Sequence, residues 1–285
     1  MHRLNLFPLS KRETEYLDFL DSAGPRPQYL DELISDHADP RALDLLKEAN
    51  RSDLLKPDEL DAYLTDAVEK LESRESLSFS GNNRLAALLS FGKIYERRAG
   101  PLLKENVRDS FDSPTRDKAA QFLSAALRVY EEAVSESSRN RHVHLQYALA
   151  SRVVNMAHVL FSHATDFHQH DVYHVELCIA YANLMYAGHR LRKVLEDKHH
   201  GWRSSVANSA TRGEPISSDE FLSPGAFLGY RELKRRLAET ANIASILFSY
   251  GQLMTDGKSG RVKHMNHLYS LYVKPYVRSH LLDCS

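Results

Sequence analysis

Cysteine is scarce in this chain of 285 residues, which contains only Cys178 and Cys284. Cys178 lies in an apolar stretch and Cys284 is next to the last residue, so the two provide no disulfide framework. Scarce cysteine is typical of proteins from a reducing compartment. Charged residues follow the first short apolar run at once, which is unlike a secretory leader. The sequence therefore predicts a cytoplasmic protein.

Long apolar runs and an excess of one charge are also missing. No stretch of about 18 consecutive apolar residues occurs, so we expect neither a transmembrane helix nor a membrane partner. The formal net charge is −1, from 37 Lys and Arg against 38 Asp and Glu. A chain that is 42% hydrophobic and 26% charged is typical of globular proteins. The overall charge gives no general attraction to nucleic acid or lipid.

The motifs of common cofactor and metal enzymes are not found. The segment from Gly257 to Arg261 lacks the Gly-Lys-Ser/Thr ending that a phosphate-binding P-loop requires. The sequence has no His-Glu-x-x-His motif and no closely spaced cysteine pair. We therefore expect no cofactor, and the favoured interpretation is a non-enzymatic protein.

Helix signals dominate the chain, and no segment is clearly a strand. Ser10 and Glu13 have the spacing of a capping box, and Pro40 and Pro57 suit the first position of a helix. The sequence predicts an all-α fold, either a multi-helix bundle or an irregular helical solenoid built on a central pair of long antiparallel helices. That pair spans residues 146–196 and has apolar residues at helical spacing. They are Leu149, Val153, Met156, Ala157, Leu160 and Ala164, then Val172, Val175, Ile179, Ala182, Met185, Tyr186 and Leu191.

The charge distribution and the polar segments suggest four parts. Residues 1–75 contain ten Lys or Arg and eighteen Asp or Glu, which indicates an acidic N-terminal helical subdomain. Residues 84–198 form the central helical core, and residues 199–222, rich in Ser and Gly, form a flexible loop. Residues 223–285 form basic C-terminal helices packed on the core, since residues 225–285 contain nine Lys or Arg and four Asp or Glu. These charges either attract partners or are simply solvated helix faces.

Two fragments combine small residues with aromatic ones. Phe91-Gly92 with Tyr95, and Ala126 with Tyr130 and Ala133, resemble turns of tetratricopeptide helices. No 34-residue period accompanies them. The small residues therefore indicate places where two helices approach closely.

Arg139-Asn140, followed by His144, is the sharpest local motif. It resembles the active-site motif of HEPN ribonucleases, all-helical proteins that generally pair two copies to build the site. The resemblance implies metal-independent RNA cleavage, in which Arg139 stabilises the charge on the scissile phosphate and His144 helps proton transfer. The toxin-type motif has a Tyr where this sequence has Gln146. The alternative is a charged turn between two helices.

Histidines gather where the two central helices meet. His170 and His174 are four residues apart, so on a helix both rings could reach one metal ion, with Asp171 as a further ligand. The alternative is a His-rich helix terminus that Asp166 or Asp171 caps. The second interpretation is favoured, and no metal is expected.

The C-terminal helices combine cations with tyrosines. Lys and Arg can neutralise phosphates and Tyr can stack on unpaired bases, although an amphipathic helix that buries Tyr has the same pattern. The candidate nucleic-acid-binding residues are Arg231, Lys234, Arg235, Arg236, Arg261 and Lys263.

Taken together, these features favour a non-enzymatic helical scaffold or adaptor. We expect it to bind a protein partner or to self-associate, and to contact RNA through its basic C-terminal helices. The alternative function is a HEPN-like ribonuclease that uses Arg139 and His144.

Overall fold

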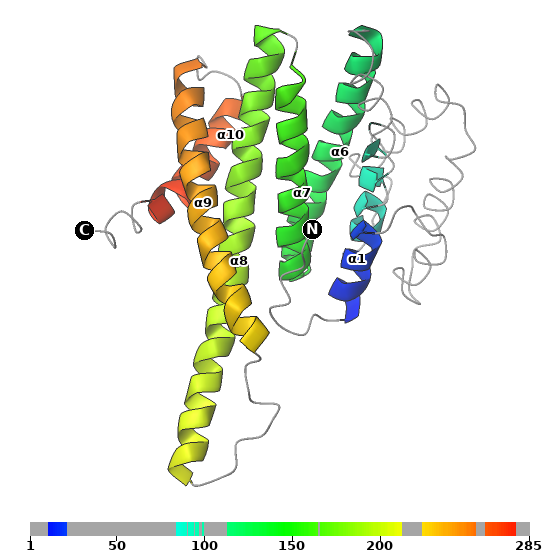
Figure 1. The fold of residues 1–285 in the computed structure, drawn as a ribbon. Helices are drawn as coiled ribbons and strands as arrows, with labels where there is room; N and C mark the ends of the chain where they lie inside the picture. Colours follow the sequence, from blue (N-terminus) through cyan, green and yellow to red (C-terminus); the bar gives the residue numbers. More distant parts are fainter. Residues whose placement is uncertain are drawn as a thin grey trace. The chain divides into compact units, whose positions relative to one another are not determined.

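The computed structural model describes residues 11–21, most of 84–99, 113–164, 166–212, 224–254 and 260–277. The chain forms two compact units, one of Ser10–Ala164 and one of Met1–Leu9 with Thr165–Ser285. All regular structure in the described residues is helical, which confirms the predicted all-α class (Figure 1). The short helices predicted between residues 29 and 71 lie outside these residues, so the four-part division stays a prediction.

The unit of residues 10–164 is built on a helical hairpin. Helix α6 (Ser113–Arg139) packs along α7 (Val143–Ser162), and α1 (Lys11–Asp21) also contacts α7. The apolar positions predicted for the first central helix are buried here, with the exception of the half-buried Ala164. Glu13 of α1 accepts a hydrogen bond from the His144 N–H at 3.2 Å, which ties α1 to the start of α7. Ser10, its predicted capping partner, is not among the described residues.

One arginine joins most of this unit. Arg152 on α7 lies 2.7 Å from the Glu96 carboxylate and donates to the Leu20 carbonyl at 3.2 Å. The Tyr130 hydroxyl of α6 donates to the same carboxylate at 3.2 Å, and the guanidinium lies 5.7 Å from the centre of the Tyr130 ring. Burial raises the pKa of Tyr130 well above its ordinary value, so the hydroxyl keeps its proton. A single side chain thus links α1, Glu96, α6 and α7.

The predicted close approach of two helices is found at Gly92. A Cβ atom added there would lie 2.6 Å from a carbon of the Tyr130 ring, which is fully buried. Any larger residue at position 92 would have to displace that ring. The small residue noted in the sequence is therefore a packing requirement.

The other unit is arranged around α8 (Phe167–Arg212). Helices α9 (Pro224–Met254) and α10 (Gly260–Leu268) pack on α8, as does the π-helical turn Tyr269–Val273 (Figure 1). Most apolar positions predicted for the second central helix are buried; Tyr186 is half-buried. Val172, in the second turn, is an exception because its side chain is 43% exposed.

Helix α8 is longer than predicted. Residues 199–212, expected as the first part of an irregular loop, continue the helix to Arg212. Gly201 costs about 1 kcal/mol relative to Ala in a helix. Extending an existing helix, however, adds one hydrogen bond per residue without a new nucleation cost. The prediction of a loop is therefore wrong for this stretch.

The two predicted central helices belong to different units, because α7 ends before Thr165 and α8 begins after it. In the structure α7 packs on α6, and α8 packs on α9. The pairing of α7 with α8 stays a prediction. Among the described helices, none combines the length and the apolar character needed to cross a membrane.

The last described helix changes its winding before Pro275. The Lys274 N–H donates to the Tyr269 carbonyl, which is the wider spacing of a π-helix. Residues 274–277 then return to α-helical geometry. The widened turn lies just before Pro275, which has no N–H of its own to donate to the helix.

Gly92→Ala tests the close contact with Tyr130. We expect the variant to lower the free energy of unfolding by about 1 kcal/mol or more, because overpacking costs more than Ala gains in a helix. Gly260→Ala is the control, since nothing lies within 4 Å of a Cβ atom at that position. Urea unfolding of both variants measures the difference. Equal stability of Gly92→Ala and the wild type would show that the ring moves aside freely.

Candidate functional site

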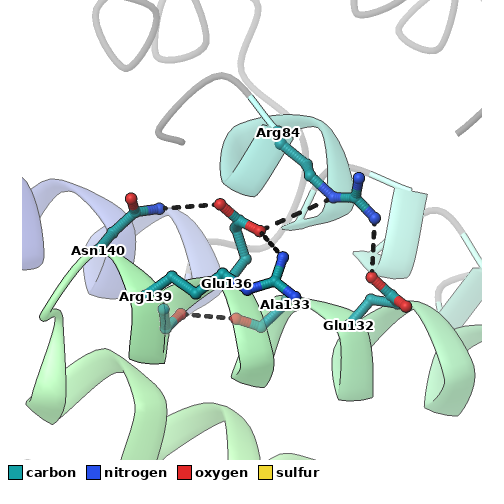
Figure 2. Close-up of polar contacts among 7 residues, drawn as sticks. Arg84, Glu132, Ala133, Glu136, Arg139 and Asn140 are labelled. Atoms are coloured by element: carbon teal, nitrogen blue, oxygen red, sulfur yellow. Dashed lines mark hydrogen bonds and ion pairs between the residues drawn. The ribbon is translucent and has the colours of Figure 1, made fainter. Parts of the chain in front are cut away.

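A buried carboxylate organises the end of α6. The Glu136 side chain, 7% exposed, lies 3.1 Å from Arg139 and 3.9 Å from Arg84, and Asn140 donates to it at 3.3 Å. Figure 2 shows these three residues around the carboxylate, with the Arg139 side chain bent back along its own helix. Arg84 also reaches the exposed Glu132 at 2.9 Å. The cluster neutralises a charge that would otherwise be costly to bury.

The turn after α6 has the geometry of a Schellman motif. The His142 N–H donates to the Ser137 carbonyl at 2.9 Å, and the Arg141 N–H donates to the Ser138 carbonyl at 3.3 Å. Arg141 has a φ of 60°, a left-handed conformation that glycine usually adopts. The spacing between Arg139 and His144 therefore spans a tight helix-to-helix turn.

The two residues of the ribonuclease-like motif contact different carboxylates. Arg139, whose side chain is 70% exposed, pairs with Glu136. His144, whose side chain is 12% exposed, has its Nδ1 atom 3.6 Å from Glu13. Of the contacts described at this turn, none joins Arg139 to His144. The structure places both residues at one turn without assembling them into a catalytic pair, and the ribonuclease alternative stays a prediction.

Glu136→Gln tests the carboxylate cluster. Losing the charge leaves two arginines without their buried partner, so we expect the free energy of unfolding to fall by about 1–3 kcal/mol. Glu132→Gln is the matched control, because it also faces Arg84 but its side chain is 52% exposed. Exposed pairs contribute little, and this control should change stability by less than about 0.5 kcal/mol. Equal effects of the two variants in urea unfolding would contradict the role given to Glu136.

His174, one of the candidate metal ligands, has contacts of another kind. The Nε2 atom of buried His174 is 2.8 Å from the Leu247 carbonyl, which makes Nε2 the protonated nitrogen. The ring also lies edge-on to Tyr250, with the centroids 5.3 Å apart. Asp166 accepts from the Gln169 N–H at 2.7 Å, as a helix-capping residue does. In the part of the chain that the structure describes, no three His, Cys, Asp or Glu residues are grouped to hold a metal ion.

The pH dependence of stability tests the placement of His174. Burial lowers the pKa of His174 below its ordinary value near 6.5. Below pH 6.5 the His174 side chain binds a proton more readily in the unfolded chain than in the folded one. The contribution of the neutral, buried His174 to the free energy of unfolding is therefore fully present above pH 6.5 and is lost as the pH decreases. We expect His174→Gln, which keeps a donor for the Leu247 carbonyl, to lose less stability between pH 7.5 and 5.5 than the wild type. Burial also lowers the pKa of His158 and His264, whose contributions remain in both proteins. Parallel curves for the two proteins would show that His174 does not contribute.

The predicted nucleic-acid-binding cations are partly neutralised within the chain. Arg235 pairs with Glu232 and Glu239, and Arg236 lies 2.7 Å from Glu232. These hydrogen bonds hold the pKa of Glu232 at about 2, so its negative charge persists. Arg261 donates to Glu176 of α8 at 2.8 Å. The side chains of Arg231, Lys234 and Lys263 are exposed to solvent.

A cleft of about 720 Å³ lies between α8 and the segment that follows α10. Tyr186 and Tyr272 contact each other in its wall, with ring centroids 4.6 Å apart. Burial raises the pKa of Tyr272 and Tyr276, so both phenols are neutral at pH 7. The cleft is lined by Tyr186, His189, Arg190, Arg192, Lys193, Glu196, Asp197, Leu271, Tyr272, Pro275 and Tyr276.

Along α8 the cations of this cleft come first, at residues 190, 192 and 193, and the carboxylates follow at residues 196 and 197. Arg192 lies 3.4 Å from Glu196, which also accepts a hydrogen bond from the Tyr230 hydroxyl at 2.7 Å. Arg190 lies over the Tyr186 ring at 5.8 Å and Arg192 over the Tyr276 ring at 6.0 Å. Arg190 and Lys193 were not among the residues predicted from the sequence. The signal was available, because Tyr186, His189, Arg190 and Lys193 have helical spacing.

The solvent face of α9 carries a short apolar seam. Ile243, Ile246 and Tyr250 are 42%, 71% and 46% exposed, respectively, and they follow Glu239 at spacings of four, three and four residues. This spacing keeps side chains on one face of a helix and is that of a coiled-coil seam. The opposite face of α9 is buried, with Leu237, Ala244 and Phe248 inward.

Comparison of the chain with protein-family models, with curated proteins and with solved structures finds no match.

Proposed function

We propose that this protein is a non-enzymatic helical adaptor that binds an acidic amphipathic helix of a partner protein along the solvent face of α9. The observation that carries the proposal is the exposed seam of Ile243, Ile246 and Tyr250. Apolar residues in a four–three spacing gain no stabilisation while they are exposed to water, but they pack well against a second helix. Ile246, at 71% exposure, is the centre of this surface.

The charges beside the seam favour an acidic occupant. The half of α9 that precedes Ile243 has four cations between residues 231 and 239, against Glu232 and Glu239. Ion pairs within α9 hold Arg235 and Arg236 in place without removing this surplus. A partner helix with carboxylates at that end gains attraction and a defined orientation.

The test uses a synthetic acidic peptide of about 20 residues with an apolar seam, long enough to form a helix in contact with α9. A scrambled peptide of the same composition has no seam. We expect Ile246→Asp to weaken binding of the seam peptide at least tenfold, because a charge replaces an isoleucine whose burial against the peptide contributes about 1.5–3 kcal/mol. Fluorescence anisotropy with labelled peptides measures both affinities.

Asn155→Asp is the matched control. It adds the same charge at an exposed position of another helix, α7, and it should change the affinity by less than threefold. Equal binding of the seam and scrambled peptides would overturn the proposal. So would a wild-type dimer in light scattering that Ile246→Asp converts to a monomer, because the occupant would then be a second copy of this chain.

A further inference from the structure

We infer that the cleft between α8 and the segment after α10 binds a nucleotide unit, with the base against its tyrosines and the phosphate near Arg190 and Lys193. The inference is independent of the adaptor function, since α9 contributes none of the residues that line the cleft. It also concerns other cations than those predicted on α9 and α10.

The size and the walls of the cleft suit a base. A volume of about 720 Å³ falls within the range of small-molecule sites, roughly 300–1,000 Å³. Tyr186 and Tyr272 are in contact with each other, inclined at 37° with their centroids 4.6 Å apart, and Tyr276 is buried against His189 at 4.9 Å. The base therefore stacks on the face of the half-buried Tyr272 ring that is turned away from Tyr186, because every base has a flat π-face.

The charges in the cleft select an anion. Glu196 is already held by Arg192 and by the Tyr230 hydroxyl, so its charge is compensated within the protein. Arg190 and Lys193 add two positive charges one turn apart on α8, where a phosphate can meet both. A cationic ligand is disfavoured, because arginines already lie over the rings of Tyr186 and Tyr276.

The charge of Asp197 decides at which end of the cleft the phosphate lies. Asp197 lies seven residues beyond Arg190, about 10 Å along the axis of α8. Its charge repels a phosphate at that end, so the phosphate belongs near Arg190.

The same nucleotide chemistry is offered by a free mononucleotide and by single-stranded nucleic acid, and the experiment separates these two sources.

The experiment measures binding of AMP and of a labelled adenylate oligonucleotide of about eight nucleotides, a length typical of a single-strand site. Adenosine serves as the probe without phosphate. We expect the full-length protein to bind AMP at least fivefold more tightly than adenosine. Similar affinity for AMP and the oligonucleotide identifies a mononucleotide site, and much tighter binding of the oligonucleotide identifies a single-strand site. Both results support the inference.

The variants separate stacking from charge. Tyr272→Leu should weaken binding at least fivefold, the lower limit for loss of one base stack, whereas Tyr272→Phe keeps the ring and should stay within twofold. Lys193→Glu is on an exposed side chain, so it tests the phosphate contact without disturbing the fold. We expect it to weaken AMP binding about tenfold at low salt, the factor that corresponds to 1.4 kcal/mol.

Arg128→Glu is the matched charge control. Arg128 is an exposed cation on α6, in the other unit, and it is not among the residues that line the cleft. It should leave AMP binding unchanged. The inference is overturned if neither AMP nor the oligonucleotide binds at millimolar concentration, if both Tyr272→Leu and Lys193→Glu bind as the wild type does, or if Arg128→Glu weakens binding as much as Lys193→Glu.

Discussion

The unit of residues 10–164 depends on the guanidinium of Arg152. This group meets a carboxylate from residues 84–99, a carbonyl from α1 and a tyrosine ring from α6, while its own backbone belongs to α7. A planar group with five donors can satisfy several partners at once, which a lysine ammonium cannot do with the same geometry. The position of the Tyr130 ring, and with it the need for glycine at position 92, follows from this arrangement.

Local patterns were sufficient to predict the helical class and the core positions. The spacing of Leu149, Val153 and Leu160 identified the buried face of α7, because a helix that packs on others must place its apolar residues on the contact side. The same reasoning identified Val175 and Ile179 on α8. It was wrong at Val172. This residue fits the apolar spacing, but it lies near the start of α8 and its side chain is 43% exposed.

Features that depend on distant residues could not be predicted. Glu13 was assigned to a local cap, but its carboxylate meets the start of α7, 131 residues away. Arg141 adopts a left-handed conformation without being glycine or asparagine, so no turn signal marked its position. The cleft brings Tyr186 next to Tyr272, and no sequence spacing connects two residues on different helices. The cleft is therefore visible only in the three-dimensional arrangement, whereas the spacing of Ile243, Ile246 and Tyr250 is visible in the sequence and the structure adds their exposure.

The π-helical turn Tyr269–Val273 has a consequence for how this chain tolerates changes in length. Its widened loop accommodates one more residue than an α-helical turn of the same rise. Removing one residue there would restore regular winding and leave Pro275 and Tyr276 at nearly the same place in the wall of the cleft. Removing a residue from a regular α-helical turn instead rotates everything beyond it by about 100° around the helix axis. The widened turn is therefore the point at which this helix can lose a residue and still keep the C-terminal wall of the cleft in place.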